Sequence, residues 1–296
     1  MSEPGAAAPG VPVTAMPTVA DSVAPTVLVT RPQPQADAWV ARLQAAGVSA
    51  LALPLLRIEP DAAFLPAVAR AWQTLAGGGW HLVMFVSPNA VLQFFEQAPA
   101  SGHEAWPTAT LAGATGPGTV AALRAAGVPE AAIAQPAPTA PSFDAEALWR
   151  DALAARDWSG RAVLIVRGET GRDWLADTLR SAGAQVETLA AYRQRGPDWQ
   201  GEDASLARNL QWLGGAAARG EQRPVWLFSS SQAIAHLCDD QAAPGAGPAD
   251  VRDWPALATH PRIADTARRA GFRSVREVRP DVAAVAAALR EDRSIQ

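Results

Sequence analysis

The sequence predicts an α/β protein with two similar flavodoxin-like parallel-sheet domains, joined by a two-stranded β connector, with the middle domain inserted into the first. Three observations lead to this architecture. Segments of the first half recur in the second half; each recurring segment has the pattern of a strand, a tight turn and a helix; and two long apolar segments, 49–60 and 184–197, link the halves. A chain of 296 residues is long enough for two hydrophobic cores.

The recurrence covers three pairs of segments in the same order. Residues 27–58 align without a gap with residues 163–194, so that Gly47 falls on Gly183. Two further pairs follow, FVSPNAV at 85–91 with FSSSQAI at 228–234, and GPGTVAALRAAGV at 116–128 with HPRIADTARRAGF at 260–272. The matched Gly, Pro and Arg positions are more informative than the matched alanines, because alanine-rich helices resemble one another by composition alone. The chain is therefore predicted to contain two copies of one unit.

Each element has its own sequence signal. Residues 1–25 are rich in Ala and Pro and lack the basic start of a signal peptide, which predicts a disordered leader. The β-branched runs VLVT and VLIV predict buried parallel strands, and Gly47 and Gly183 are predicted to end the helices that follow them. Asp281 is predicted to cap the final helix.

The two long apolar segments predict how the domains are connected. Each is read as an edge strand that runs on into an interdomain connector, at 52–57 and 188–195, with the two connectors side by side. One domain would then comprise 26–51 and 196–296, and the inserted domain would comprise 58–187. Right-handed crossovers would make both sheets open and parallel.

Composition excludes several functions. The sequence has no lysine, so a Schiff-base lysine, a pyridoxal-phosphate anchor and a Walker-type phosphate lysine are absent. The single Cys238 argues against a disulfide or a multi-cysteine zinc site, and no metal site is expected. The net charge of −4 gives no general attraction for nucleic acid, and no apolar run would span a membrane. A cytoplasmic monomer is expected.

The predicted ligand site lies at the carboxyl ends of the strands, beside helix N-termini. If the two copies face each other, their six strand-end turns line one cleft that suits a ligand with several anionic groups. The turns are Arg31-Pro32, Ser87-Pro88-Asn89, Gly116-Pro117-Gly118-Thr119, Arg167-Gly168-Glu169, Ser229-Ser230-Ser231 and His260-Pro261-Arg262-Ile263.

These segments, in this order, resemble the uroporphyrinogen-III synthase family over residues 27–280. The resemblance is carried by VTRP, PLLRIEP, FVSPNAV, GPGTVAALRAAG, LIVRGETGRDWL, the strand that reaches Tyr192, FSSSQA and HPRIADTARRAGF. It implies a cofactor-independent hydro-lyase of tetrapyrrole biosynthesis that cyclises hydroxymethylbilane, a linear tetrapyrrole with four acetates and four propionates. The implied reaction loses water, closes the ring through a spiro intermediate and inverts the last pyrrole.

Tyr192, the only tyrosine of the chain, matches the tyrosine that the family places on the returning connector, facing the cleft. It is the candidate proton donor; the alternative is a tyrosine that only packs. Because the reference pKa of a phenol is about 10, its contribution should be modest. Tyr192→Phe is expected to lower turnover by about one or two orders of magnitude.

The other candidates are substrate-binding. Hydroxyl groups of the turns either bind substrate or cap helices, and arginines either meet carboxylates or form surface salt bridges. The candidates are Arg31, Ser87, Asn89, Gly118, Thr119, Arg167, Gly168, Ser230, Ser231, His260 and Arg262.

Two other functions fit parts of the sequence. GATGPG, from Gly113, resembles a dinucleotide-binding loop, but no acidic residue follows about twenty positions later at a strand end. A two-lobed, non-catalytic binding protein for an anionic small molecule would explain the duplication equally well. Turnover of hydroxymethylbilane would distinguish it from an enzyme.

Overall fold

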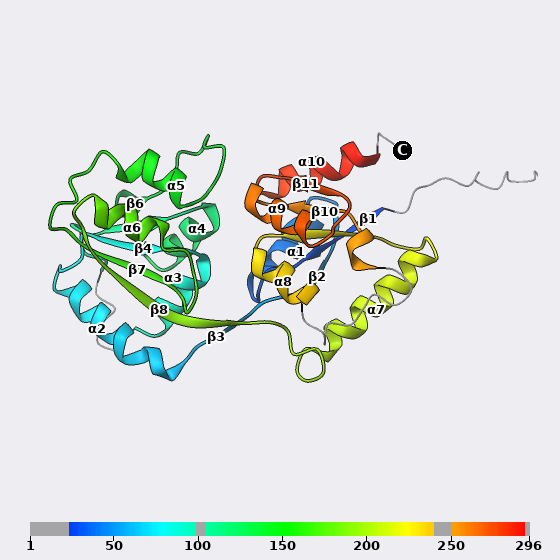
Figure 1. Cartoon of the computed structure of the whole chain (residues 1–296), viewed down its shortest axis with the longest axis horizontal. Helices are drawn as coiled ribbons and strands as arrows, with labels where there is room; N and C mark the ends of the chain where they lie inside the picture. Colours follow the sequence, from blue (N-terminus) through cyan, green and yellow to red (C-terminus); the bar gives the residue numbers. More distant parts are fainter. Residues whose placement is uncertain (1–23, 99–104, 240–249, 294–296) are drawn as a thin grey trace, which may run out of the picture.

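The computed structural model describes residues 24–98, 105–239 and 250–293, and its strands form two sheets in two separate α/β domains. Figure 1 shows these domains side by side, joined along one edge by the segments that contain β3 and β8. The predicted fold class, two parallel-sheet α/β domains, is confirmed. The predicted leader falls outside the described residues except for its end, where the first strand already begins at Pro25.

The terminal domain contains a five-stranded, wholly parallel sheet in the order β11-β10-β9-β1-β2. Its strands are β1 (Pro25–Val29), β2 (Ser49–Ala52), β9 (Arg223–Phe228), β10 (Ala256–Ala258) and β11 (Val275–Glu277). In chain order within the domain, this arrangement is the flavodoxin-like order 2-1-3-4-5.

The inserted domain contains a six-stranded sheet in the order β3-β8-β7-β4-β5-β6. Its strands are β3 (Arg57–Glu59), β4 (Leu82–Phe85), β5 (Leu111–Ala114), β6 (Ile133–Ala134), β7 (Ala162–Gly168) and β8 (Gln185–Arg195). All neighbours are parallel except β3 and β8.

The spatial order of the strands supports the duplication. The sequence repeat equates β1 with β7, β9 with β4 and β10 with β5. With β2 matched to β8 and β11 to β6, the five matched strands have the same order in both sheets. Apart from β3, which has no counterpart in the other sheet, the inserted domain begins with the unit's third strand and ends with its first two strands, so the two copies are circularly permuted relative to each other.

Helices cover both faces of each sheet. The helices are α1 (Gln35–Ala45), α2 (Leu65–Ala76), α3 (Pro88–Glu96), α4 (Pro117–Ala125), α5 (Ala145–Leu148), α6 (Trp174–Ser181), α7 (Ala204–Ala218), α8 (Ser231–Asp239), α9 (Pro261–Arg269) and α10 (Val282–Arg293). Short helical turns are η1 (Ala62–Phe64), η2 (Glu130–Ala132), η3 (Trp149–Leu153) and η4 (Val251–Asp253). In the inserted domain, α2, α3 and α4 pack on one face and α5 and α6 on the other.

The strands are apolar on both faces because both faces are covered. In β1, Leu28 packs with the helices α7, α8 and α9, whereas Val27 and Val29 pack with α1 and α10. In β7, Leu164 and Val166 face one core and their neighbours the other. This alternation explains the continuous apolar runs that predicted buried parallel strands.

The predicted helix ends are found. Gly47 follows α1 with φ +75° and Gly183 follows α6 with φ +94°, a left-handed conformation that side-chain-bearing residues rarely adopt. Asp281 caps α10, because its Oδ1 accepts a hydrogen bond from the backbone N–H of Ala284 at 2.8 Å.

The connecting segments lie side by side in an antiparallel ladder. β8 pairs with β7 over most of its length and then pairs with β3, with Arg57 opposite Arg195 and Glu59 opposite Arg193. The pairing on the first segment thus covers residues 57–59, whereas the predicted connector covers 52–57. Residues 53–56 form no strand.

Candidate functional site

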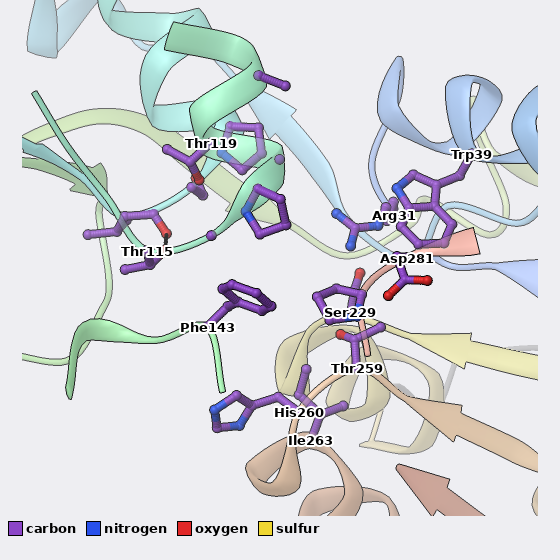
Figure 2. A pocket seen from close by; sticks show the side chains of 18 of the residues that line it. Arg31, Trp39, Thr115, Thr119, Phe143, Ser229, Thr259, His260, Ile263 and Asp281 are labelled. Carbon is purple, nitrogen blue, oxygen red and sulfur yellow. Dashed lines mark hydrogen bonds between the residues drawn. The ribbon is translucent and has the colours of Figure 1, made fainter. Parts of the chain in front are cut away.

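A cavity of about 550 Å³ lies between the two domains. Residues of both domains line it: Arg31, Trp39, Arg42, Val86, Ser87, Pro88, Thr115, Gly116, Pro117, Gly118, Thr119, Ala121, Phe143, Ser229, Thr259, His260, Ile263, Pro280 and Asp281. Figure 2 shows side chains converging on it from both sides, with Thr115, Thr119 and Phe143 opposite Arg31, Ser229 and Asp281.

The cavity is built from the carboxyl ends of strands of both sheets. Arg31 follows β1, Ser87 follows β4, and Ser229 follows β9. Gly116 and His260 occupy the equivalent turns after β5 and β10, so residues of five of the six predicted turns line the cavity. The two sheets therefore turn the carboxyl ends of their strands toward each other, as the sequence predicts.

Arg31 is a largely buried arginine of the cavity wall. Its Nε is buried without a hydrogen-bond partner, and its guanidinium forms no ion pair with any described residue. Burial, together with the nearby charge of Arg42, lowers the pKa of Arg31 to about 10. A guanidinium that is partly desolvated and unpaired is prepared to bind an anion, because the anion would supply the missing partner.

Tyr192 departs from its predicted position. Its side chain is only 1% exposed, it belongs to the core of the inserted domain, and it is absent from the residues that line the cavity. The expectation that Tyr192 itself faces the cleft is therefore wrong. Its hydroxyl lies 3.0 Å from Oγ of Ser87, which does line the cavity.

Burial raises the pKa of Tyr192, and hydrogen bonds with Ser87 and the backbone of Gly168 offset only part of this shift. Ser87 also caps α3, because its Oγ accepts a hydrogen bond from the backbone N–H of Ala90 at 3.2 Å. If Tyr192 also donates a hydrogen bond to this oxygen, the hydroxyl proton of Ser87 is not used in either bond and can be donated to another group. The buried phenol is thus linked to the cavity through the half-buried hydroxyl of Ser87.

Thr119, Gly118 and His260 lie in the cavity wall as predicted. Thr119 is not the cap of α4, since the N-cap is Gly116 and no side chain bonds there. His260 caps α9 by accepting at Nδ1 from the backbone N–H of Arg262, and its Nε2 lies 3.0 Å from Asp144. Because Nδ1 accepts, Nε2 carries the proton that is donated to Asp144.

The remaining predicted residues lie outside the cavity and have partners of their own. Arg167 pairs with Asp173 at 2.7 Å, and Arg262 pairs with Glu146. Ser230 caps the start of α8 by accepting from the N–H of Gln232.

Ser231 Oγ lies 3.1 Å from the Thr266 hydroxyl. Asn89 is buried and accepts from Gln35. Gly168 is buried beside the ring of Tyr192.

Several polar contacts hold the domains together around the cavity. Gln35 Nε2 of α1 donates to Asn89 Oδ1 of α3 at 2.5 Å. On another side of the cavity, His260 and Arg262 of the terminal domain meet Asp144 and Glu146 of the inserted domain. Burial alone would raise the pKa of Asp144, but hydrogen bonds from the backbone of Ala147 and from His260 outweigh it and hold that pKa below its ordinary value.

Sequence reasoning missed some cavity residues because they do not belong to strand-end turns. Trp39 and Arg42 project from α1, and Phe143 lies in the loop after β6. The three-residue spacing of Trp39 and Arg42 places them on one helix face next to Arg31. The guanidinium of Arg279 packs over the ring of Phe143, with its central carbon 5.3 Å from the ring centre.

Within the part of the chain that the structure describes, no group of three His, Cys, Asp or Glu side chains is arranged to hold a metal ion. In the same residues, no helix is both long and apolar enough to span a membrane.

The fold and cavity define a two-domain α/β protein with an arginine-bearing site between duplicated units. A family model for uroporphyrinogen-III synthase HemD matches residues 37–287. The chain is 29% identical over 220 residues to the uroporphyrinogen-III synthase of Synechococcus elongatus, covering 74% of this chain and 75% of that protein. It is 31% identical over 189 residues to the Salmonella typhimurium uroporphyrinogen-III synthase, covering 61% and 70%.

A solved structure of a mutant uroporphyrinogen III synthase from Thermus thermophilus has the same fold, with a TM-score of 0.54 and 18% identity. The match covers 92% of this chain and all of that one, 100%. The chain belongs to the uroporphyrinogen-III synthase family.

Proposed function

We propose that this protein is an enzyme of tetrapyrrole synthesis that converts hydroxymethylbilane to uroporphyrinogen III. Its family and its named relatives support this activity, and the observation that carries it here is the unpaired guanidinium of Arg31 inside the interdomain cavity. The substrate carries eight carboxylates, and an anion-binding group at the meeting point of two strand-end surfaces suits such a ligand.

The proposed reaction begins with loss of the terminal hydroxyl as water, which leaves an electrophilic azafulvene. The far pyrrole attacks through its substituted carbon, forming a spiro intermediate that fragments and recloses with that ring inverted. The balance is one water lost per substrate, with no oxidation or reduction. The protein's contribution is to fold the chain so that its two ends meet and to protonate the leaving hydroxyl.

We assign the proton donation to the pair formed by Ser87 and Tyr192. Ser87 is the member in the cavity wall, and Tyr192 lies 3.0 Å behind it. Because the phenol keeps its proton through neutral pH, it donates to Ser87 and polarises the serine hydroxyl, which in turn donates to the leaving group. Thr119 and Gly118, at the start of α4 in the same domain, are also proposed to contact the substrate.

The test is turnover of freshly generated hydroxymethylbilane by the purified protein, with separation of the uroporphyrinogen isomers. Hydroxymethylbilane closes spontaneously to the I isomer, so production of the III isomer in proportion to enzyme concentration would support the proposal. Binding without formation of the III isomer would instead indicate a two-lobed binding protein and would overturn it.

A further inference from the structure

Two arginines flank one tryptophan in the cavity wall. The guanidinium carbon of Arg31 lies 4.9 Å from the ring centre of Trp39, and that of Arg42 lies 5.5 Å from it. All three residues line the interdomain cavity. The indole holds each cation by a cation–π contact, which fixes its position without neutralising its charge.

In the part of the chain that the structure describes, neither cation has a carboxylate partner. Among the described residues, no Asp or Glu oxygen forms an ion pair with Arg31 or Arg42. The nearest acidic group in the cavity wall is Asp281, whose Oδ1 is already engaged by the backbone N–H of Ala284. Figure 2 shows Asp281 and Ser229 on the same side of the cavity as Arg31.

Other arginines around the site differ in this respect. Arg167 and Arg262 each have a carboxylate partner, and Arg279 donates to the carbonyl of Pro138 while covering Phe143. Two neighbouring like charges repel each other, and an enclosed charge is costly without a partner. The cavity keeps such a pair, which indicates that a ligand supplies the counter-charges.

We propose that Arg31 and Arg42, positioned by Trp39, bind two carboxylates of the substrate that stand on neighbouring carbons of one pyrrole ring. This inference rests on the proposed function and identifies where one ring would be held. Arg31 would bind the more enclosed carboxylate and Arg42 the more exposed one. The indole of Trp39 is only 7% exposed and contacts both guanidiniums, so its role is to hold the two cations in place.

The first experiment measures KM and kcat for hydroxymethylbilane in Arg42→Gln. Because Arg42 is exposed, its ion pair should be weak and salt-dependent, so we expect KM to rise about two- to fivefold with kcat nearly unchanged. The increase should shrink as salt is added at constant pH. Arg208→Gln is the matched control, since Arg208 is an exposed arginine of α7 away from the cavity.

The second experiment uses citrate as a probe and measures the melting temperature at constant ionic strength. Citrate should stabilise the parent protein and Arg208→Gln, and should stabilise Arg42→Gln less. Asp281→Asn should be stabilised more than the parent, because the change removes a negative charge from the wall while asparagine can still cap α10.

The outcomes separate this inference from the proposed function. If the parent makes the III isomer but Arg42→Gln keeps the parent KM and citrate response, the two-carboxylate site is wrong and the function stands. If the parent makes no III isomer but citrate stabilises it in an Arg42-dependent way, the function is wrong and an anion site stands. Equal citrate stabilisation in all four proteins would overturn the site.

Discussion

The phenol oxygen of Tyr192 lies 3.0 Å from Oγ of Ser87, and only Ser87 reaches the interdomain cavity. This pair connects a buried side chain of the inserted domain to the site between the domains. If it protonates the substrate, the residue that touches the leaving group is the serine, and the tyrosine acts through it.

The first prediction concerns the ionisation of Tyr192. The chain has one tyrosine, so the ultraviolet absorption of tyrosinate reports on this residue alone. Because burial raises its pKa, we expect the titration midpoint in the folded protein to lie above 10. A midpoint at or below 10 would contradict the buried, proton-retaining phenol.

The same shift predicts the alkaline stability of the protein. An unfolded phenol ionises near pH 10, whereas the folded one keeps its proton to higher pH, so stability contributed by the neutral phenol is present below pH 10 and is lost as pH rises beyond it. The difference in unfolding free energy between the parent and Tyr192→Phe should therefore change above about pH 10. A difference independent of pH would argue against the linkage.

The second prediction separates the two hydroxyls by activity. Ser87→Ala should lower kcat at least as much as Tyr192→Phe, each by about tenfold or more, because the serine is the cavity-facing member. Ser87→Ala also loses a helix cap, at a cost of about 0.5–2 kcal/mol in stability. Ser230→Ala is the matched control, since it removes the equivalent cap in the other copy. If Ser230→Ala lowers kcat as much as Ser87→Ala does, the loss of activity would be due to lost stability and not to a role of Ser87 in proton donation.

The third prediction concerns Arg31. The lowered pKa of about 10 means that its charge is disfavoured in the folded protein at neutral pH. Arg31→Met should thus melt at the same temperature as the parent or higher, while KM for hydroxymethylbilane rises at least about tenfold. This destabilisation of the folded state is present below pH 10 and is relieved as the pH rises above 10, where the unfolded chain binds more protons than the folded one. A lower melting temperature with unchanged KM would show that Arg31 is structural.

The fourth prediction concerns Gly168. A Cβ at this position would lie 3.0 Å from Cε2 and 3.3 Å from Cζ of Tyr192. Gly168→Ala should therefore displace the phenol from Ser87, destabilise the protein by about 1–3 kcal/mol and lower kcat. Gly77→Ala is the steric control, because Gly77 does not line the cavity and the nearest atom to its Cβ would be the backbone oxygen of Gln73 at 3.5 Å. If Gly168→Ala has the melting temperature and kcat of the parent, the ring of Tyr192 can move to accommodate the added Cβ without losing its function.

The fifth prediction concerns Phe143. Its ring enters the cavity between the domains, and the guanidinium of Arg279 covers it. Phe143→Ala should enlarge the cavity and loosen the fold of the bound substrate, so the fraction of I isomer should rise. The isomer ratio is measured at saturating substrate, and the melting temperature serves as the control. An unchanged ratio would remove Phe143 from substrate positioning.

The fold could be predicted because the repeat constrains it. Gly47 and Gly183 have equivalent positions and conformations, and the runs around Val27 and Val163 form equivalent strands. Because the same order of strand, turn and helix signals occurs in both copies, few strand topologies are compatible with the sequence. The start of the ladder could not be predicted as well, since nothing in the residues 52–59 distinguishes an extended linker from a paired strand.

The site could be predicted only in part, because a turn's position does not determine where its side chains point. Arg31 lies in the cavity, but its repeat partner Arg167 does not, since β7 continues to Gly168 and Arg167 pairs with Asp173. Tyr192 was predicted on the correct strand but on the cavity side, and its pairing in a covered sheet buries it instead. Trp39 and Phe143 come from a helix and a loop that strand-end reasoning does not reach.

Arg57 and Arg195, the first and last residues of the ladder, are direct partners across it. The segment that leads into the inserted domain and the segment that leads out of it therefore lie next to each other. We expect that this domain could be excised as an independent piece whose new ends already touch, and that a short peptide bridging residues 56 and 196 could restore continuity to what remains. Such separated halves would each carry one wall of the cavity and would have to meet in solution to complete it.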